Sequence, residues 1–80
     1  MKSVYILQSI PNPEQYYVGL ADFADERLKS HNRGESFHTA KYKPWKIIIS
    51  VHFADDRKAQ TFERYLKTGS GRAFVKRHFR

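Results

Sequence analysis

The sequence predicts a small α+β domain in which a three-stranded, mainly antiparallel sheet is flanked by helices. Three short apolar runs rich in β-branched and aromatic residues have the length and composition of strands. Three other segments have helical spacing, and the order along residues 1–80 is β-β-α-β-α-α. Strands interrupted by one helix and followed by a helical end are typical of a layered α+β fold. We therefore expect one domain without linkers or repeats.

The predicted strands are residues 4–10, 16–20 and 47–53. A Pro-Asn-Pro sequence ends the first run, and the gap before the second suits a hairpin with a long loop. The third run contains three consecutive isoleucines, which favours burial on both faces of the sheet. The loop at 35–46 is expected to be irregular, and its basic and aromatic residues are typical of a binding element.

The first predicted helix lies between the second and third strands. Asp22 is expected to cap its N-terminus, and Gly34 is expected to end it. Two acidic residues in the first turn favour the helix because they complement its dipole. Its apolar stripe, which His31 continues at helical spacing, consists of Phe23, Ala24 and Leu28.

Two more helices are predicted after the third strand. The longer one begins at residue 55 or 56 and runs to residue 67, and Gly69 is expected to stop it. The shorter one covers residues 72–78, with Ser70 as its cap. Helices packed against the sheet would give each apolar face a partner.

An excess of positive charge is the clearest feature of the composition. The 80 residues include 15 Lys and Arg against eight Asp and Glu, a formal net charge of +7. This balance favours a polyanionic partner, of which nucleic acid is the commonest, although a basic domain without such a partner is the alternative. The absence of cysteine excludes disulfides and thiolate metal sites and fits a cytoplasmic location. No apolar run has the length of a membrane span, so we expect no membrane partner.

Three polar residues on the predicted helices are candidates for chemistry, and each also has an ordinary explanation. Glu63 lies beside the apolar stripe of the second helix, where it either binds a partner such as a metal or pairs with Lys67 four residues later. Arg27 and His31 share one face of the first helix. A guanidinium fork suits phosphate oxygens and an imidazole moves protons, while a plain surface pair is the alternative.

Two tyrosines on the predicted strands complete the set of candidates. Tyr5 and Tyr17 lie on strands that we expect to be neighbours. Tyrosines in strands commonly serve for packing, but a buried phenol needs a hydrogen-bond partner, and two phenols at one edge of a sheet would hold a water or a phosphate.

The segments around these five residues follow one another in a characteristic order. They are VYI (4–6), YVG (17–19), DERLKSHNRG (25–34), PWK (44–46) and FERYLK (62–67). This order resembles the GIY-YIG nuclease superfamily, in particular its small stand-alone, excinuclease-like members. The first triplet has valine where the motif's name has glycine. The resemblance covers nearly the whole chain and implies a domain that cuts phosphodiester bonds with one divalent cation, Mg²⁺ or Mn²⁺.

The resemblance also implies a role for each of the five residues. Glu63 would be the metal ligand and Arg27 the clamp on the phosphate. Tyr5 would be the base that acts on the attacking water. Tyr17 and His31 would orient that water or stabilise the charge on the phosphate.

The leading hypothesis from the sequence is a metal-dependent DNA endonuclease that acts in repair or recombination. Because 80 residues leave no room for a separate reader domain, structure-selective or single-strand cutting is expected. Leu20 stands where some family members carry a lysine, which leaves open a non-catalytic nucleic-acid-binding module or an interaction module with a repair-protein partner. The basic residues expected to contact the nucleic acid are Lys41, Lys43, Lys46, Lys67, Arg72 and Lys76.

Overall fold

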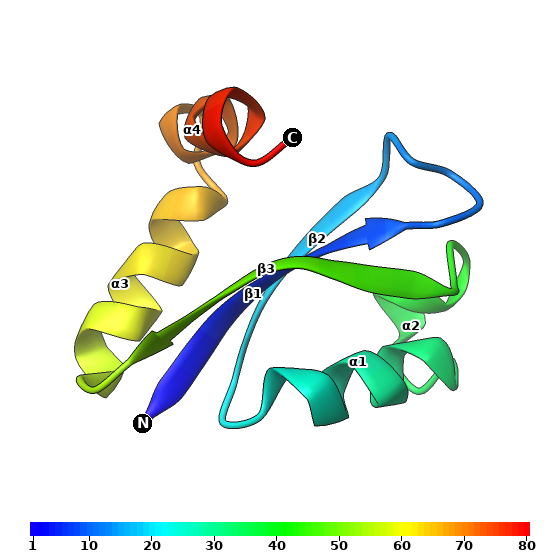
Figure 1. The fold of residues 1–80 in the computed structure, drawn as a ribbon, viewed down its shortest axis with the longest axis horizontal. Helices are drawn as coiled ribbons and strands as arrows, with labels where there is room; N and C mark the ends of the chain where they lie inside the picture. Colours follow the sequence, from blue (N-terminus) through cyan, green and yellow to red (C-terminus); the bar gives the residue numbers. More distant parts are fainter.

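The computed structural model describes residues 1–80 and has the predicted elements with one addition. The strands are β1 (Lys2–Ser9), β2 (Tyr16–Ala21) and β3 (Trp45–Phe53). The helices are α1 (Ala24–Asn32), α2 (Phe37–Ala40), α3 (Asp56–Leu66) and α4 (Gly69–His78). The strands form one antiparallel sheet in the order β2-β1-β3 (Figure 1), which confirms the predicted fold class. The loop predicted to be irregular instead contains the short helix α2.

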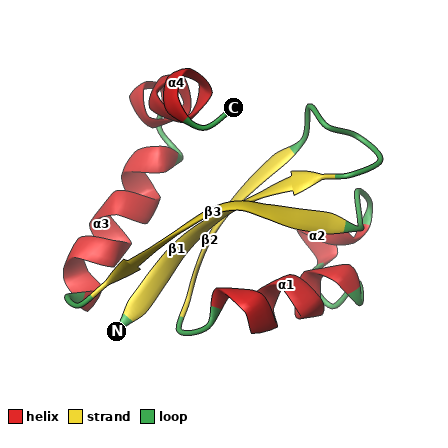
Figure 2. Ribbon diagram, viewed as in Figure 1, coloured by secondary structure: helices red, strands yellow, loops and turns green.

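Helices cover both faces of the sheet, and β1 runs through its middle (Figure 2). Val4 and Ile6 point toward α3 and α4, while Tyr5 and Leu7 point toward α1. β1 is therefore the strand that is buried on both faces. The prediction that residues 47–53 would hold that place is wrong, because β3 is an edge strand and its three isoleucines are only half-buried. None of the helices has the length and apolar character needed to cross a membrane.

The start of α1 differs from the prediction. Asp22 does not cap the helix: its carboxylate accepts a hydrogen bond from Nζ of Lys2 at 2.9 Å. Ser3 pairs with Ala21 in the sheet, so Lys2 and Asp22 meet across the ends of adjacent strands. The N-cap position is occupied by Phe23, which makes no side-chain cap and is 69% exposed rather than part of the apolar stripe.

The corner between α3 and α4 also differs from the prediction, although α3 begins at Asp56 as expected, with the side chain of Asp55 as its cap. α4 begins at Gly69, and the hydroxyl of Thr68 caps it by accepting from the N–H of Gly71 at 3.1 Å. Ser70 is therefore not a cap, and Gly69 belongs to α4. The corner is so tight that a Cβ on Gly71 would lie 1.8 Å from the carbonyl oxygen of Tyr65.

Candidate active site

Tyr5 lies in the middle of the central strand, on the face covered by α1, and is 1% exposed. Its hydroxyl is 3.0 Å from Nε2 of His31. Gly19 is its partner residue on β2, and a Cβ there would lie 2.3 Å from the tyrosine hydroxyl. Any side chain at position 19 would therefore displace the phenol, which gives a physical reason for the glycine at the end of the second motif segment.

His31 joins Tyr5 to a residue that the sequence did not single out. His31 is 0% exposed, and its Nδ1 lies 2.7 Å from Oγ1 of Thr39 in α2. Thr39 is also buried, and its carbonyl accepts a hydrogen bond of 2.8 Å from Nε1 of Trp45. Tyr5, His31 and Thr39 thus form one continuous hydrogen-bonded chain inside the protein. We call it the buried chain.

The direction of the hydrogen bonds follows from the charges around this chain. Burial lowers the pKa of His31, and the nearby Arg27 guanidinium lowers it further, so the imidazole is neutral at neutral pH. A neutral imidazole has one donor and one acceptor nitrogen. The carbonyl of Ser36, 3.5 Å away, is available as an acceptor for the hydroxyl of Thr39. We therefore assign the tautomer in which Thr39 accepts from Nδ1–H and Nε2 accepts from the hydroxyl of Tyr5.

The phenol of Tyr5 is held in its neutral form by its surroundings. Burial raises the pKa of Tyr5, and the positive charges of Arg27 and Lys67 oppose that shift without cancelling it. A neutral phenol is the donor that the buried chain requires. Arg27 lies one turn before His31 on α1 and is exposed, and its positive charge acts on the pKa of both Tyr5 and His31.

Tyr17 lies against the buried chain from β2. Its ring centroid is 4.9 Å from that of His31 and 6.5 Å from that of Tyr5. Tyr17 is half-buried, so it forms the boundary between the interior and the solvent. The structure therefore brings four of the five candidate residues together from β1, β2 and α1.

Glu63, the fifth candidate, lies on α3 and forms an ion pair with Lys67, which was the alternative to metal binding. Its Oε2 is 2.6 Å from Nζ of Lys67. The glutamate side chain is 16% exposed and the lysine side chain 51% exposed, so the pair reaches solvent from the lysine side. Lys67 lines one cleft with Tyr17 and acts on the pKa of Tyr5, which places the pair at the rim of the same site.

No group of three or more His, Cys, Asp or Glu side chains is arranged to hold a metal ion. Glu63 offers a single carboxylate with hard oxygen donors and partial exposure. Mg²⁺ commonly keeps several waters and takes one or two protein carboxylates together with substrate phosphate oxygens. The donor set therefore fits a hard divalent cation that is bound mainly together with a substrate.

The basic residues predicted to contact nucleic acid fall into two groups. Lys41, Lys43 and Lys46 lie between α2 and the start of β3. At the opposite end of the molecule, Lys67 follows α3, and Arg72 and Lys76 lie on α4 (Figure 1). All six are exposed. Lys67 alone among them pairs with an acid, so five are free to meet an anionic partner.

Comparison with known proteins gives a family match and several relatives. The model of the GIY-YIG catalytic domain matches residues 1–77. Structure-specific endonuclease subunit SLX1 of Debaryomyces hansenii is 34% identical over 71 residues, which are 80% of this chain and 20% of that protein. The SLX1 subunit of Candida dubliniensis is 37% identical over 71 residues, 80% of this chain and 25% of that protein.

A bacterial relative is closer in size. UPF0213 protein CPE1444 of Clostridium perfringens is 34% identical over 68 residues, which are 84% of this chain and 71% of that protein. The chain thus spans about a fifth to a quarter of the SLX1 subunits and most of the bacterial relative.

Proposed function

The chain belongs to the GIY-YIG catalytic-domain family, and we propose that it is an endonuclease that hydrolyses phosphodiester bonds of DNA. The observation that carries this proposal is the buried chain of Tyr5, His31 and Thr39, together with the positive charges of Arg27 and Lys67 that act on Tyr5 and the Glu63 carboxylate paired with Lys67. A neutral proton-transfer pair next to exposed groups that bind phosphate and a cation is the combination that hydrolysis requires.

The buried chain provides a base without requiring an ionised tyrosine. A phenol with a raised pKa does not ionise readily, but in the assigned tautomer its hydroxyl donates to the neutral Nε2 of His31 at 3.0 Å. When the hydroxyl of Tyr5 takes a proton from the attacking water, its own proton passes to Nε2. Tyr5 is neutral before and after the step, and His31 becomes the imidazolium. The hydroxide attacks phosphorus, the bond to the leaving oxygen breaks, and that oxygen takes a proton from solvent. His31 returns to its neutral form when its extra proton passes back through the hydroxyl of Tyr5 to solvent.

The exposed residues act on the charge of the phosphate. Arg27 offers a planar fork of donors that matches two non-bridging oxygens, and the hydroxyl of Tyr17 supplies a further donor at the boundary. Glu63 would exchange Lys67 for one divalent cation, Mg²⁺ or Mn²⁺, and Lys67 would then be free to bind the substrate. When bound, that cation supplies Lewis-acid stabilisation of the leaving oxygen.

The substrate class is inferred from the relatives and from the single site. The SLX1 subunits are named structure-specific endonucleases, which supports structure-selective or single-strand cutting by this chain. One site per chain would give nicks. Because those relatives are named as subunits, we include a protein partner in the proposal, and a role in DNA repair or recombination within the cytoplasm.

A second function is favoured by one observation. The carboxylate of Glu63 is already neutralised by Lys67 at 2.6 Å. If this ion pair persists in the presence of cations and DNA, the chain is a nucleic-acid-binding or interaction module that keeps the fold without cleavage.

A cleavage assay separates the two functions. Labelled single-stranded, duplex and branched DNA are incubated with the protein in Mg²⁺, Mn²⁺ or EDTA, and the wild type is compared with Glu63→Gln. We expect nicking that requires a cation and falls at least a hundredfold in the variant, of the order found for groups that stabilise transition-state charge. Glu26→Gln, at an exposed acid in the first turn of α1, is the matched control and should cut normally. Cleavage by Glu63→Gln at the wild-type rate would contradict the proposal.

A further inference from the structure

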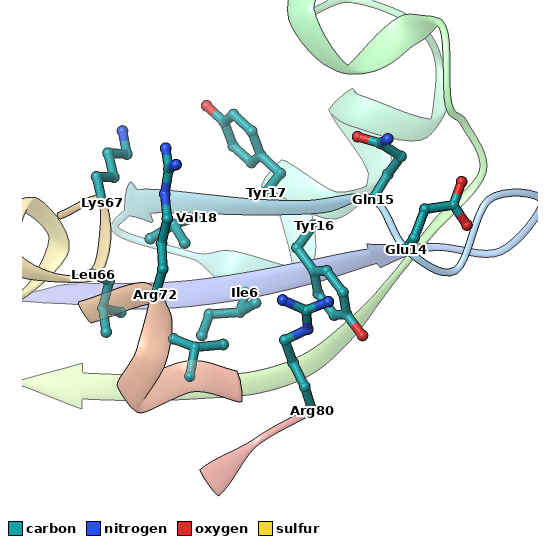
Figure 3. A pocket seen from close by; sticks show the side chains of 11 residues that line it. Ile6, Glu14, Gln15, Tyr16, Tyr17, Val18, Leu66, Lys67, Arg72 and Arg80 are labelled. Atoms are coloured by element: carbon teal, nitrogen blue, oxygen red, sulfur yellow. The ribbon is translucent and has the colours of Figure 1, made fainter. Parts of the chain in front are cut away.

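A cleft of about 420 Å³ lies between β2, the end of α3 and α4, next to the candidate active site (Figure 3). It shares Tyr17 and Lys67 with that site. Apolar side chains lie beneath it, and Tyr16 forms a wall on the side away from Tyr17. The apolar residues are Ile6, Val18, Leu66 and Val75.

The charges around the cleft are unequal from one end to the other. Lys67 and Arg72 extend in the same direction as the hydroxyl of Tyr17, at one end (Figure 3). Glu14 is the single acid that lines the cleft, and it lies at the other end. No Asp or Glu follows Glu63 in the sequence, so α4 is uniformly basic. The cleft therefore favours an anion at the end nearest the active site.

The wall of the cleft carries an exposed stacking surface. The guanidinium of Arg80 lies 4.0 Å from the centroid of the Tyr16 ring, and Tyr16 is held in turn by a hydrogen bond of 3.0 Å from Nε2 of Gln8. Arg80 is exposed and forms no ion pair with an acid, so its guanidinium is accessible to a ligand in the cleft. Nucleobases stack on guanidinium planes and on aromatic rings in proteins that bind single strands.

We propose that this cleft binds one unpaired nucleotide of the DNA strand adjacent to the bond that is cut. Its phosphate lies between Lys67 and Arg72, and its base stacks on the Arg80–Tyr16 pair. The volume of about 420 Å³ is within the range of pockets that hold one small ligand, such as a single nucleotide. This inference rests on the proposed function and deepens it: this cleft would select substrates with an unpaired nucleotide, such as flaps and branches.

The test uses a short single-stranded oligonucleotide that contains 2-aminopurine, whose fluorescence falls when the base stacks. Binding is measured in EDTA, so that cleavage plays no part. Wild-type protein should quench the probe, and Arg80→Ala should abolish the quenching and weaken binding about fivefold or more, as expected for loss of one stacked base. Arg77→Ala is the matched control, because Arg77 is an exposed arginine of α4 that does not line the cleft.

The outcomes distinguish this inference from the proposed function. Equal quenching by Arg80→Ala and Arg77→Ala, or no quenching by the wild type, contradicts the proposal that the cleft binds an unpaired nucleotide. Neither result bears on the cleavage assay. If quenching depends on Arg80 but the protein cuts no DNA, nucleotide binding in the cleft is supported and the proposed endonuclease activity is contradicted. A thermal melt of Arg80→Ala that matches the wild type shows that lost quenching does not come from unfolding.

Discussion

The two sides of the candidate site are built in different ways. On the α1 side of the sheet, Tyr5, His31 and Thr39 are almost completely buried and form a chain of neutral groups. On the α3–α4 side, Lys67 and Arg72 are exposed and charged. Packing fixes the first set to within hydrogen-bond distances, whereas solvent screens the second set and leaves it adjustable.

This difference matches two chemical tasks. A proton moves along a hydrogen bond whose donor and acceptor are fixed, and exclusion of water keeps His31 neutral and able to accept it. A phosphate or a hydrated cation must arrive from solvent, so its partners have to remain accessible. Tyr17, half-buried between the two sides, is where these tasks meet.

The largest effect is expected from removing the phenol. Tyr5→Phe deletes the hydroxyl that lies 3.0 Å from Nε2 of His31, so no group remains to take the proton from water. The cleavage rate should fall by about a hundredfold to ten-thousandfold, the range for loss of a general base. DNA binding in EDTA should not change, because the charged side of the site is intact. A rate within about threefold of the wild type would mean that the buried chain is only structural.

A second prediction concerns the geometry of the charged side. Gly71→Ala places a Cβ 1.8 Å from the carbonyl oxygen of Tyr65, so the α3–α4 corner has to open. We expect a loss of about 3 kcal/mol in the free energy of unfolding, at the upper end of the usual cost of overpacking. Weakened binding of single-stranded DNA should accompany it, because Arg72 follows directly in α4.

Gly69→Ala is the control for this prediction. Gly69 is also in α4, and nothing lies within 4 Å of a Cβ built on it. This variant should be as stable as the wild type or slightly more stable, because alanine favours the helix. Urea unfolding monitored by circular dichroism compares the two variants. Equal stability of both would contradict the close approach at Gly71.

The sequence predicted the exposed cations of the charged side and two residues of the buried chain, Tyr5 and His31, but it missed the third, Thr39. Four of the five candidate residues come together because their motif segments lie on adjacent strands and one helix. Thr39 carried no signal, since its four-residue helix is too short for a hydrophobic period. The isoleucines of β3 were misleading because strand order, and not composition, decides which strand is central. Asp22 was misassigned as a cap because its partner Lys2 is distant in sequence.

Thr39→Val tests the residue that the sequence missed. The substitution keeps the shape but leaves Nδ1–H of His31 without an acceptor in the interior, which costs about 1–3 kcal/mol of stability. The imidazole should then populate the other tautomer, with Nε2–H facing Tyr5, and cleavage should slow because Nε2 no longer accepts a proton. Nitrogen chemical shifts of His31 in ¹⁵N NMR report the tautomer directly. Thr39→Ser retains the hydroxyl and should retain both the tautomer and the rate.

The pH dependence of stability should come from the buried side. Burial lowers the pKa of His31 below its unfolded value, so the unfolded chain binds more protons as the pH falls below about 6.5. Stability should therefore decline from that pH downward until the lower folded pKa is reached. Thermal melts between pH 8 and pH 4 measure this decline. It should be smaller in His31→Gln, and an unchanged profile in that variant would assign the effect to other groups.

The smallest effect is expected from the unpaired cations of the charged side, which act mainly through release of counterions from the DNA. Arg72→Ala removes one exposed, unpaired cation at the cleft and should weaken DNA binding modestly at low salt. When the logarithm of the DNA-binding constant is plotted against the logarithm of salt concentration, the negative slope should become less steep by about one unit for one lost phosphate contact. Lys43→Ala, in the other basic group, changes the charge equally and shows whether the same strand reaches that end of the molecule. Equal slopes for the two variants would mean that DNA spans both ends. A change in Arg72→Ala alone would place the bound strand along α4, where its phosphates meet the adjustable charges of Lys67 and Arg72.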